Sequence, residues 1–159
     1  MRTRDAFLWQ AEQFIGLPYR WGGDDPLAGF DCSGLVLECG KAIGLWPAKY
    51  DMTAANLYTM LKDTERAIEM VTQPGALAFW SKTPDPAKIH HVEIVWRFLD
   101  APMRWLCIGA SGGGSKTLSG EDAIDQNAYV KVRPLGDRGM NLFLADPFLL
   151  YVLTIFTLE

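Results

Sequence analysis

The residues best suited to chemistry lie together, near the start of the segment 29–44 (GFDCSGLVLECGKAIG). Asp31, Cys32 and Ser33 directly precede a run whose apolar residues recur at helical spacing. A thiol at a helix N-terminus feels the positive end of the helix dipole, which favours the nucleophilic thiolate. Cysteine is also among the most frequently buried residue types. A thiol that merely packs needs no acid and hydroxyl beside it, so Cys32 is a candidate nucleophile.

A cysteine nucleophile needs a base, and the chain has two histidines, His90 and His91. Both lie at the start of a segment, 90–99, whose residues alternate as in a strand. Adjacent residues of a strand point to opposite faces, so at most one of the two imidazoles can meet Cys32. A lone histidine is more often a surface or core residue than a base. Here, however, the pair opens an apolar strand, which would hold a base rigidly.

Metal and nucleotide sites are the competing interpretations of these residue types. Cys32, Cys39 and Cys107 could join the histidines as ligands, but none of the usual ligand spacings is present. The glycine-rich stretch 109–117 (GASGGGSKT) has Ser115 before its lysine, where a phosphate loop requires glycine. We therefore expect no metal site and no cofactor.

The composition is that of an ordinary globular protein. With 159 residues, the chain is long enough for one domain with a sizeable core, and we expect a single domain over residues 1–159. A net charge of -4 gives no basic surface for nucleic acid, so we expect no nucleic-acid partner. Three cysteines, an odd number, argue against a disulfide framework and favour a reducing compartment.

Neither end of the chain has the pattern of a membrane segment. Residues 1–16 carry acids and no apolar run of signal-peptide length. The tail, 146–159, is strongly apolar but falls short of the ~18 residues that a membrane-spanning helix needs. We expect this tail to form a buried closing strand. We also expect synthesis in the cytoplasm without a signal peptide, and no stable membrane insertion.

The remaining elements follow from periodicity and from turn residues. Asp31 and Thr53 are favoured N-cap residues for two of the helices. Helices followed by mostly antiparallel strands define an α+β protein. We expect helices at 4–15, 32–43, 53–62 and 119–127, and strands at 74–80, 90–99, 103–110 and 129–135, with a hairpin across 100–102.

Three motifs, in this order, resemble the NlpC-type family of cell-wall cysteine peptidases. They are GLPYRWGGDDPLAGFDCSGL (16–35), PGALAFW (74–80) and HVEIVW (91–96). The first is the most specific, because glycine loop, acid, thiol and helix agree over twenty residues. The resemblance covers roughly residues 14–111. It implies a papain-like α+β fold in which N-terminal helices pack on a central antiparallel sheet.

The same resemblance implies the site residues and the reaction. Cys32 corresponds to the family's nucleophile and His91 to its base, while Tyr19, Asp31 and Ser33 correspond to positions that line the substrate site. In the family, the positions of Asp31 and Ser33 help hold the free amino group of a short stem peptide. The implied activity is hydrolysis of peptidoglycan stem peptides between D-glutamate and the diamino acid, without a cofactor.

One position departs from the family pattern. On the strand after the base, the family has a polar residue, usually histidine, that orients the imidazole; here that position is Gly109. A backbone carbonyl, a water molecule or a simple Cys–His dyad would serve instead. The side chains that are open as replacements are those of Glu93, Ser111, Gln126 and Asn127.

Two further functions stay open on the sequence alone. One is a catalytically weak or silent module that binds cell-wall peptide or builds a phage tail, which Gly109 favours. The other is an amidase or acyltransferase that acts on an amide outside the cell wall. The C-terminal sequence resembles a phage- or prophage-type member, which implies tail or virion partners and delivery to the cell wall.

Overall fold

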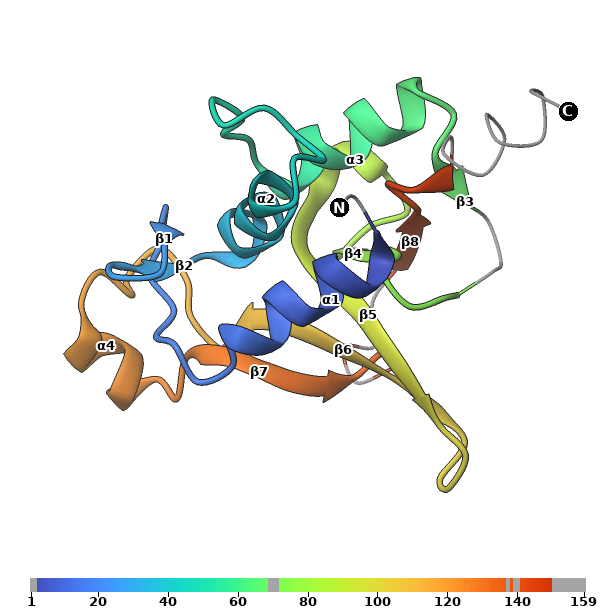
Figure 1. Ribbon diagram of the computed structural model, residues 1–159. Helices are drawn as coiled ribbons and strands as arrows, with labels where there is room; N and C mark the ends of the chain where they lie inside the picture. Colours follow the sequence, from blue (N-terminus) through green and yellow to red (C-terminus); the bar gives the residue numbers. More distant parts are fainter. Residues whose placement is uncertain (1–2, 69–71, 137, 139–140, 150–159) are drawn as a thin grey trace, which may run out of the picture.

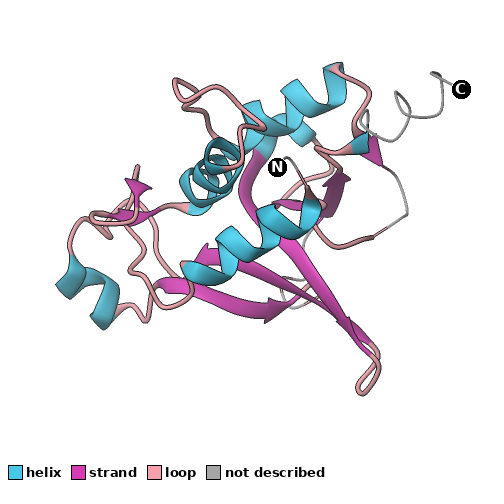
Figure 2. Ribbon diagram, viewed as in Figure 1, coloured by secondary structure: helices cyan, strands magenta, loops and turns pink. Residues whose placement is uncertain are grey.

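The computed structural model describes residues 3–68, 72–136, 138 and 141–149 (Figures 1 and 2). Its helices are α1 (Arg4–Gln13), α2 (Cys32–Ala42), α3 (Ala54–Asp63) and α4 (Gly120–Asp125), with a 3-10 turn at Pro86–Lys88. Its strands are β1 (Asp24–Asp25), β2 (Gly29–Phe30), β3 (Ala67–Ile68), β4 (Leu77–Ser81), β5 (Ile89–Leu99), β6 (Arg104–Ser111), β7 (Tyr129–Pro134) and β8 (Asn141–Ala145).

Six of the strands form one antiparallel sheet in the order β3-β8-β4-β5-β6-β7. β5 and β6 form the predicted hairpin, which projects from the body of the molecule (Figure 1). α1, α2 and α3 share one apolar core with the sheet (Figure 2). The α+β architecture, with N-terminal helices packed on an antiparallel sheet, is confirmed.

The helices begin where side chains cap them. Thr3, Asp31 and Thr53 each accept a hydrogen bond from a first-turn amide of α1, α2 and α3. Ser119 and Asp122 form a capping box at α4. The predicted caps at Asp31 and Thr53 are therefore confirmed.

The sheet buries both of its faces. The helix-side face contributes Val92 and Ile94 to the larger core. On the opposite face, Trp80, Val95 and Cys107 belong to a second, smaller apolar cluster. Residues 91–96 of β5 alternate between the two faces as predicted, but β-bulges interrupt the strand at His90 and at Trp96, and Ile89 belongs to the larger core with Val92 and Ile94.

The last strand that the structure describes is β8, which precedes the apolar tail and is directly followed by the buried Asp146. The closing strand expected within 146–159 does not include residues 146–149, and for the remainder it stays a prediction. Tail residues 150–159 lie outside the described residues. The short strands β1, β2 and β3 were not predicted, because two residues carry no periodicity. In the part of the chain that the structure describes, no helix is long and apolar enough to cross a membrane.

Asp146 ties the end of the sheet to the first helix. Its carboxylate is fully buried and accepts hydrogen bonds from the Arg4 guanidinium at 2.5 Å, from the Gln73 amide and from the Phe148 backbone N–H at 2.9 Å. A buried carboxylate is tolerated when donors of this kind surround it. The interaction therefore holds α1 against the chain that leaves β8.

We predict that Asp146→Asn lowers the free energy of unfolding by about 1–3 kcal/mol, because the amide cannot accept from all of these donors. Denaturant titration followed by circular dichroism measures the change. Asp125→Asn, an exposed acid at the end of α4, serves as the control and is expected to stay within ~0.5 kcal/mol. Equal shifts for the two variants would contradict the structural role of Asp146.

Candidate active site

Asp31 joins the glycine loop to the start of α2. Its Oδ1 accepts from the Gly34 N–H at 2.7 Å and from the Ser33 hydroxyl at 3.2 Å. Its Oδ2 accepts from the Gly22 N–H, on the loop, at 3.1 Å. Cys32, the first residue of α2, is therefore held in place between the capping group and the helix.

A close backbone contact explains the glycines of this motif. The carbonyl of Gly23 accepts from the Asp31 N–H at 2.9 Å. A Cβ built on Gly34 would lie 2.0 Å from that same carbonyl oxygen, far inside van der Waals contact. Any side chain at position 34 would force the loop away from the helix, so the loop and the thiol are positioned together.

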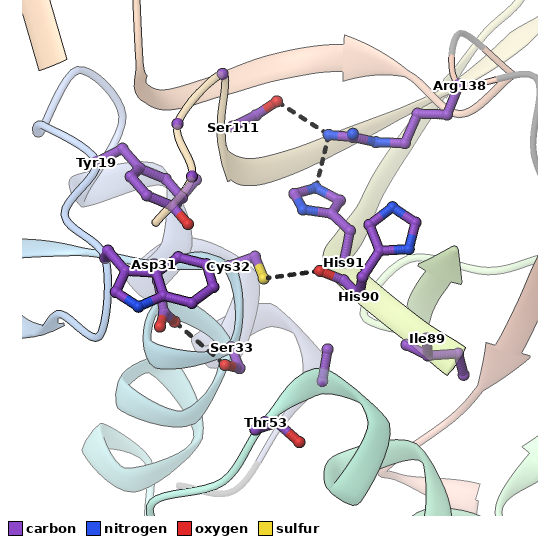
Figure 3. A pocket seen from close by; sticks show the side chains of 16 residues that line it. Tyr19, Asp31, Cys32, Ser33, Thr53, Ile89, His90, His91, Ser111 and Arg138 are labelled. Carbon is purple, nitrogen blue, oxygen red and sulfur yellow. Dashed lines mark hydrogen bonds between the residues drawn. The ribbon is translucent and has the colours of Figure 1, made fainter. Parts of the chain in front are cut away.

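The N-terminus of α2 opens onto a pocket of about 530 Å³ (Figure 3). All five residues that the sequence singled out line it, from the loop, from α2 and from β5. The lining residues are Tyr19, Trp21, Asp31, Cys32, Ser33, Thr53, Ala54, Ile89, His90, His91, Ala110, Ser111, Gly112, Gly113, Gly114 and Arg138.

His91 is buried and His90 is exposed, and the β-bulge in the pairing of β4 with β5 falls at His90. The Cys32 thiol contacts the carbonyl oxygen of His90 at 4.0 Å (Figure 3). The thiol thus meets the backbone of β5 at the residue directly before His91. The His91 ring also packs against Trp80 on β4, with the ring centroids 5.7 Å apart.

The imidazole of His91 has a carboxylate partner from its own strand. Its Nε2 lies 2.9 Å from Oε1 of Glu93. Nη2 of Arg138 lies 2.6 Å from both of these atoms and donates to the Ser111 hydroxyl at 2.9 Å. The side chains of Glu93, Arg138 and Ser111 therefore meet behind the imidazole.

This geometry shows which of the four side chains considered as replacements at the Gly109 position reach His91. Glu93 contacts His91 directly, and Ser111 is linked to it through Arg138. Gln126 instead accepts from the Thr117 hydroxyl at 2.6 Å, on the α4 side of the molecule. Asn127 follows Gln126 just beyond the end of α4, in a left-handed backbone conformation.

The electrostatics of Cys32 differ from the sequence-based expectation. Burial, followed by the negative charge of Asp31, raises the pKa of the Cys32 thiol to about 12. Hydrogen bonding from the backbone of Val92 and Ser33 lowers that pKa by a smaller amount. The expected shift toward the thiolate was therefore wrong in sign, because dehydration outweighs the helix N-terminus. The resting thiol is protonated at neutral pH.

His91 and Glu93 are perturbed in a coupled way. Burial lowers the pKa of His91, and Arg138 and His90 lower it further, while Glu93 raises it by a hydrogen bond and by its charge. Burial alone would raise the pKa of Glu93, but His91 and Arg138 outweigh it and hold that pKa below its ordinary value. The pair at rest is a neutral imidazole beside an ionised carboxylate.

The three residues expected at the substrate site all border the pocket. Burial raises the pKa of Tyr19, so its phenol stays protonated, and its hydroxyl points toward Cys32 (Figure 3). Ser33 is buried and hydrogen-bonded to Asp31. The Asp31 carboxylate faces the pocket, although three of its acceptor positions are already used within the protein.

Arg138 was not anticipated from the sequence. It lies in a glycine-flanked segment after β7, without a motif, and reaches His91 across 47 residues of chain. Its guanidinium also lies over the Trp80 ring at 5.1 Å. Among the described residues, no group of three or more histidine, cysteine, aspartate or glutamate side chains could hold a metal ion.

Comparison with curated proteins finds two informative relatives. This chain is 36% identical over 93 residues to murein DD-endopeptidase MepH of Escherichia coli (strain K12), covering 57% of this chain and 33% of that protein. It is 63% identical over 75 residues to gamma-DL-glutamyl hydrolase of Bacillus subtilis (strain 168), covering 46% of this chain and 17% of that protein. The chain thus spans a third or less of the length of these relatives.

Comparison with solved structures supports the fold. The peptidoglycan hydrolase RipB of Mycobacterium tuberculosis superimposes with a TM-score of 0.63 at 22% identity, over 91% of this chain and 64% of that one. The model of the NlpC/P60 family matches residues 16–132, which include the glycine loop, α2, β5 and β6. By this match, the chain belongs to the NlpC/P60 family.

Proposed function

We propose that this protein hydrolyses amide bonds in peptidoglycan stem peptides, with Cys32 as nucleophile and His91 as general base. The observation that carries the proposal is that a thiol at the start of α2 and an imidazole on β5 open onto one pocket. The names of two relatives, a murein endopeptidase and a glutamyl hydrolase, support the substrate class.

The proposed reaction begins from a protonated thiol and a neutral imidazole, as their pKa shifts indicate. His91 takes the Cys32 proton as the sulfur attacks the scissile carbonyl carbon, and a tetrahedral intermediate forms. Its collapse breaks the C–N bond, and His91 gives the proton to the leaving amine. A water molecule, deprotonated by His91, then attacks the thioester and releases the acid and the free thiol.

The start of α2 also suits the charge that develops on the carbonyl oxygen. The first-turn amides of a helix have no intrahelical partners and point toward the substrate side. The Gly34 N–H is occupied by Asp31, so stabilisation falls to the amides nearest Cys32. Helix α2 would therefore act on the oxyanion rather than on the resting thiol.

For substrate binding, we assign the free amino group of the stem peptide to Asp31 and Ser33. The Asp31 carboxylate lies at the pocket wall while it caps α2. Tyr19, protonated at neutral pH, would donate a hydrogen bond to the bound peptide. We propose cleavage between D-glutamate and the diamino acid.

The alternative is a member that binds cell-wall peptide, or serves in a phage tail, without cleaving. Gly109 favoured that interpretation, because glycine at this position of β6 has no side chain that could orient the base. The carboxylate of Glu93 now stands at the imidazole, which supports a working base instead. Hydrolysis of an amide outside the cell wall is a third candidate, and the activity and product measurements on stem peptides described below test it.

We predict that Cys32→Ser and His91→Gln each lower the turnover of purified stem-peptide fragments by at least ~10³-fold, because each removes an atom that takes part in the reaction. Release of new amino groups, followed by chromatography, measures the rate. Glu121→Gln, at an exposed position of α4 that does not line the pocket, is the control and is expected to keep turnover within ~3-fold. Full activity in Cys32→Ser would refute the mechanism.

We predict that mass spectrometry of the products identifies a fragment that ends in D-glutamate, with its amino terminus free. A cut at the cross-link between stems, as the name of the E. coli relative indicates for that protein, would instead separate two intact stems. That result would assign the chain a DD-endopeptidase activity and overturn the proposed bond. Cleavage of neither bond, by protein that is correctly folded, would favour the binding module.

We predict that the acid limb of kcat/KM lies below pH ~6.5, the ordinary value for histidine. The sign follows from the pKa of His91, which burial lowers, so the basic form persists to lower pH. A pH profile of the wild-type enzyme on a soluble stem peptide measures the limb. An acid limb clearly above that value would contradict a buried neutral base.

A further inference from the structure

We propose that Glu93 is the positioning residue that orients His91, and that Gly109 is a glycine because the Glu93 side chain occupies the space beside it. This inference rests on the proposed function. It places the orienting group on the strand of the base itself, two residues along, where the family resemblance places it on the next strand.

Strand geometry brings Glu93 and His91 to the same face. Residues i and i+2 of a strand point the same way, with their α-carbons ~7 Å apart. The long glutamate side chain spans this gap and reaches Nε2 at 2.9 Å. Glu93 is 1% exposed and does not line the pocket, so it reaches the reaction only through the imidazole.

The neighbouring strand leaves room for this side chain only at a glycine. Ile94 pairs with Ile108, so Gly109 faces Glu93 across the sheet. A Cβ built on Gly109 would lie 2.2 Å from Cγ and 2.7 Å from Cδ of Glu93. The carboxylate on β5 therefore requires that β6 has no side chain at position 109, where the family has its polar residue.

Two tautomers of His91 are compatible with these contacts, and the carboxylate of Glu93 at 2.9 Å favours the one in which Nε2 carries the hydrogen. Nη2 of Arg138 carries two hydrogens and has three polar atoms within reach, on Glu93, Ser111 and His91. If it donates to Glu93 and Ser111, the His91 Nε2 keeps its own hydrogen and donates to Glu93. Nδ1 is then the unprotonated nitrogen, which is the form that can accept a thiol proton.

Glu93 and Arg138 therefore favour opposite tautomers: the carboxylate accepts a hydrogen from Nε2, whereas the guanidinium can only donate one to it. Without the carboxylate, a hydrogen of Nη2 becomes free to donate to Nε2 at 2.6 Å, which places the proton on Nδ1 and blocks the base. With the carboxylate present, Arg138 holds it against the ring. A salt bridge that served only to anchor Arg138 would neither change the tautomer of His91 nor hold a carboxylate against its ring.

The charged and titratable groups around the imidazole come from several elements. Of these groups, Glu93 raises the pKa of His91 and Arg138 lowers it. The groups around the imidazole and its carboxylate partner are Glu93 and His90 on β5, Cys107 on β6, Lys131 and Arg133 on β7, Arg138 after β7, and Cys32 on α2.

We predict that Glu93→Ala lowers kcat by at least ~10-fold and leaves KM within ~2-fold of wild type. The loss should not exceed the ~10²–10⁴-fold acceleration that a positioned base contributes. Glu93→Gln keeps an acceptor for Nε2 and loses less, and its acid limb moves to lower pH. Arg138→Gln moves the acid limb to higher pH. Exposed Glu121→Gln, on α4, is the control and moves neither.

The Gly109 contact has its own double-mutant test. Gly109→Ala in the wild-type background displaces Glu93 and lowers kcat, whereas the same change in Glu93→Ala has no further effect. Gly120→Ala, at a position with nothing within 4 Å of an added Cβ, is the matched control. An equal loss from Gly109→Ala in both backgrounds would show that Glu93 is not what the glycine accommodates.

Nitrogen NMR of protein labelled with 15N-histidine tests the tautomer without any activity, because the chain has two histidines and His90→Gln assigns them. We expect the hydrogen on Nε2 of His91 in the wild type and on Nδ1 in Glu93→Ala, with thermal melting confirming folded protein. An unchanged tautomer in Glu93→Ala, and an unchanged titration in the isosteric Glu93→Gln, would overturn the inference. Wild-type inactivity on every stem peptide, with this tautomer shift present, would instead overturn the proposed function alone.

Discussion

The carboxylate of Asp31 holds the glycine loop to the first turn of α2, and the geometry of the pocket depends on that bond. Its two oxygens accept from the Gly22 and Gly34 amides and from the Ser33 hydroxyl. The contact between Gly23 and Gly34 leaves the loop no room to shift. Cys32 is consequently fixed between two anchored segments. The same carboxylate borders the pocket, so one group serves both the architecture and the charge presented to a substrate.

Burying a carboxylate costs free energy because the charged group loses its hydration, and the contacts of Glu93 offset that cost. The guanidinium of Arg138 and the imidazole of His91 both lie within hydrogen-bond distance of its Oε1. In a region of low dielectric constant, such contacts are strong and geometrically demanding. They also bring the guanidinium of Arg138 next to Trp80, whose ring belongs to the smaller apolar cluster of the sheet. The second face of the sheet thus becomes part of the site.

Two opposing effects act on the thiol. The N-terminus of α2 favours the thiolate, while burial and the Asp31 charge favour the thiol, and the second pair is larger. In the proposed reaction, the thiol therefore needs an imidazole that is neutral and correctly oriented. The environment of His91 then matters more for that reaction than the position of the thiol on its helix.

Local sequence determined much of this protein. Asp31 and Thr53 mark helix starts, alternation placed Glu93 on the same face as His91, and the loop motif placed Cys32 at the start of α2, because each of these rests on contacts within a few residues. Tertiary structure decided the rest. The alternation that put Glu93 beside His91 left four side chains as candidates for the orienting group. Only the packing of β6 at Gly109, and the approach of Arg138 from 47 residues away, single out the carboxylate. Burial, likewise a tertiary property, reversed the expected ionisation of Cys32.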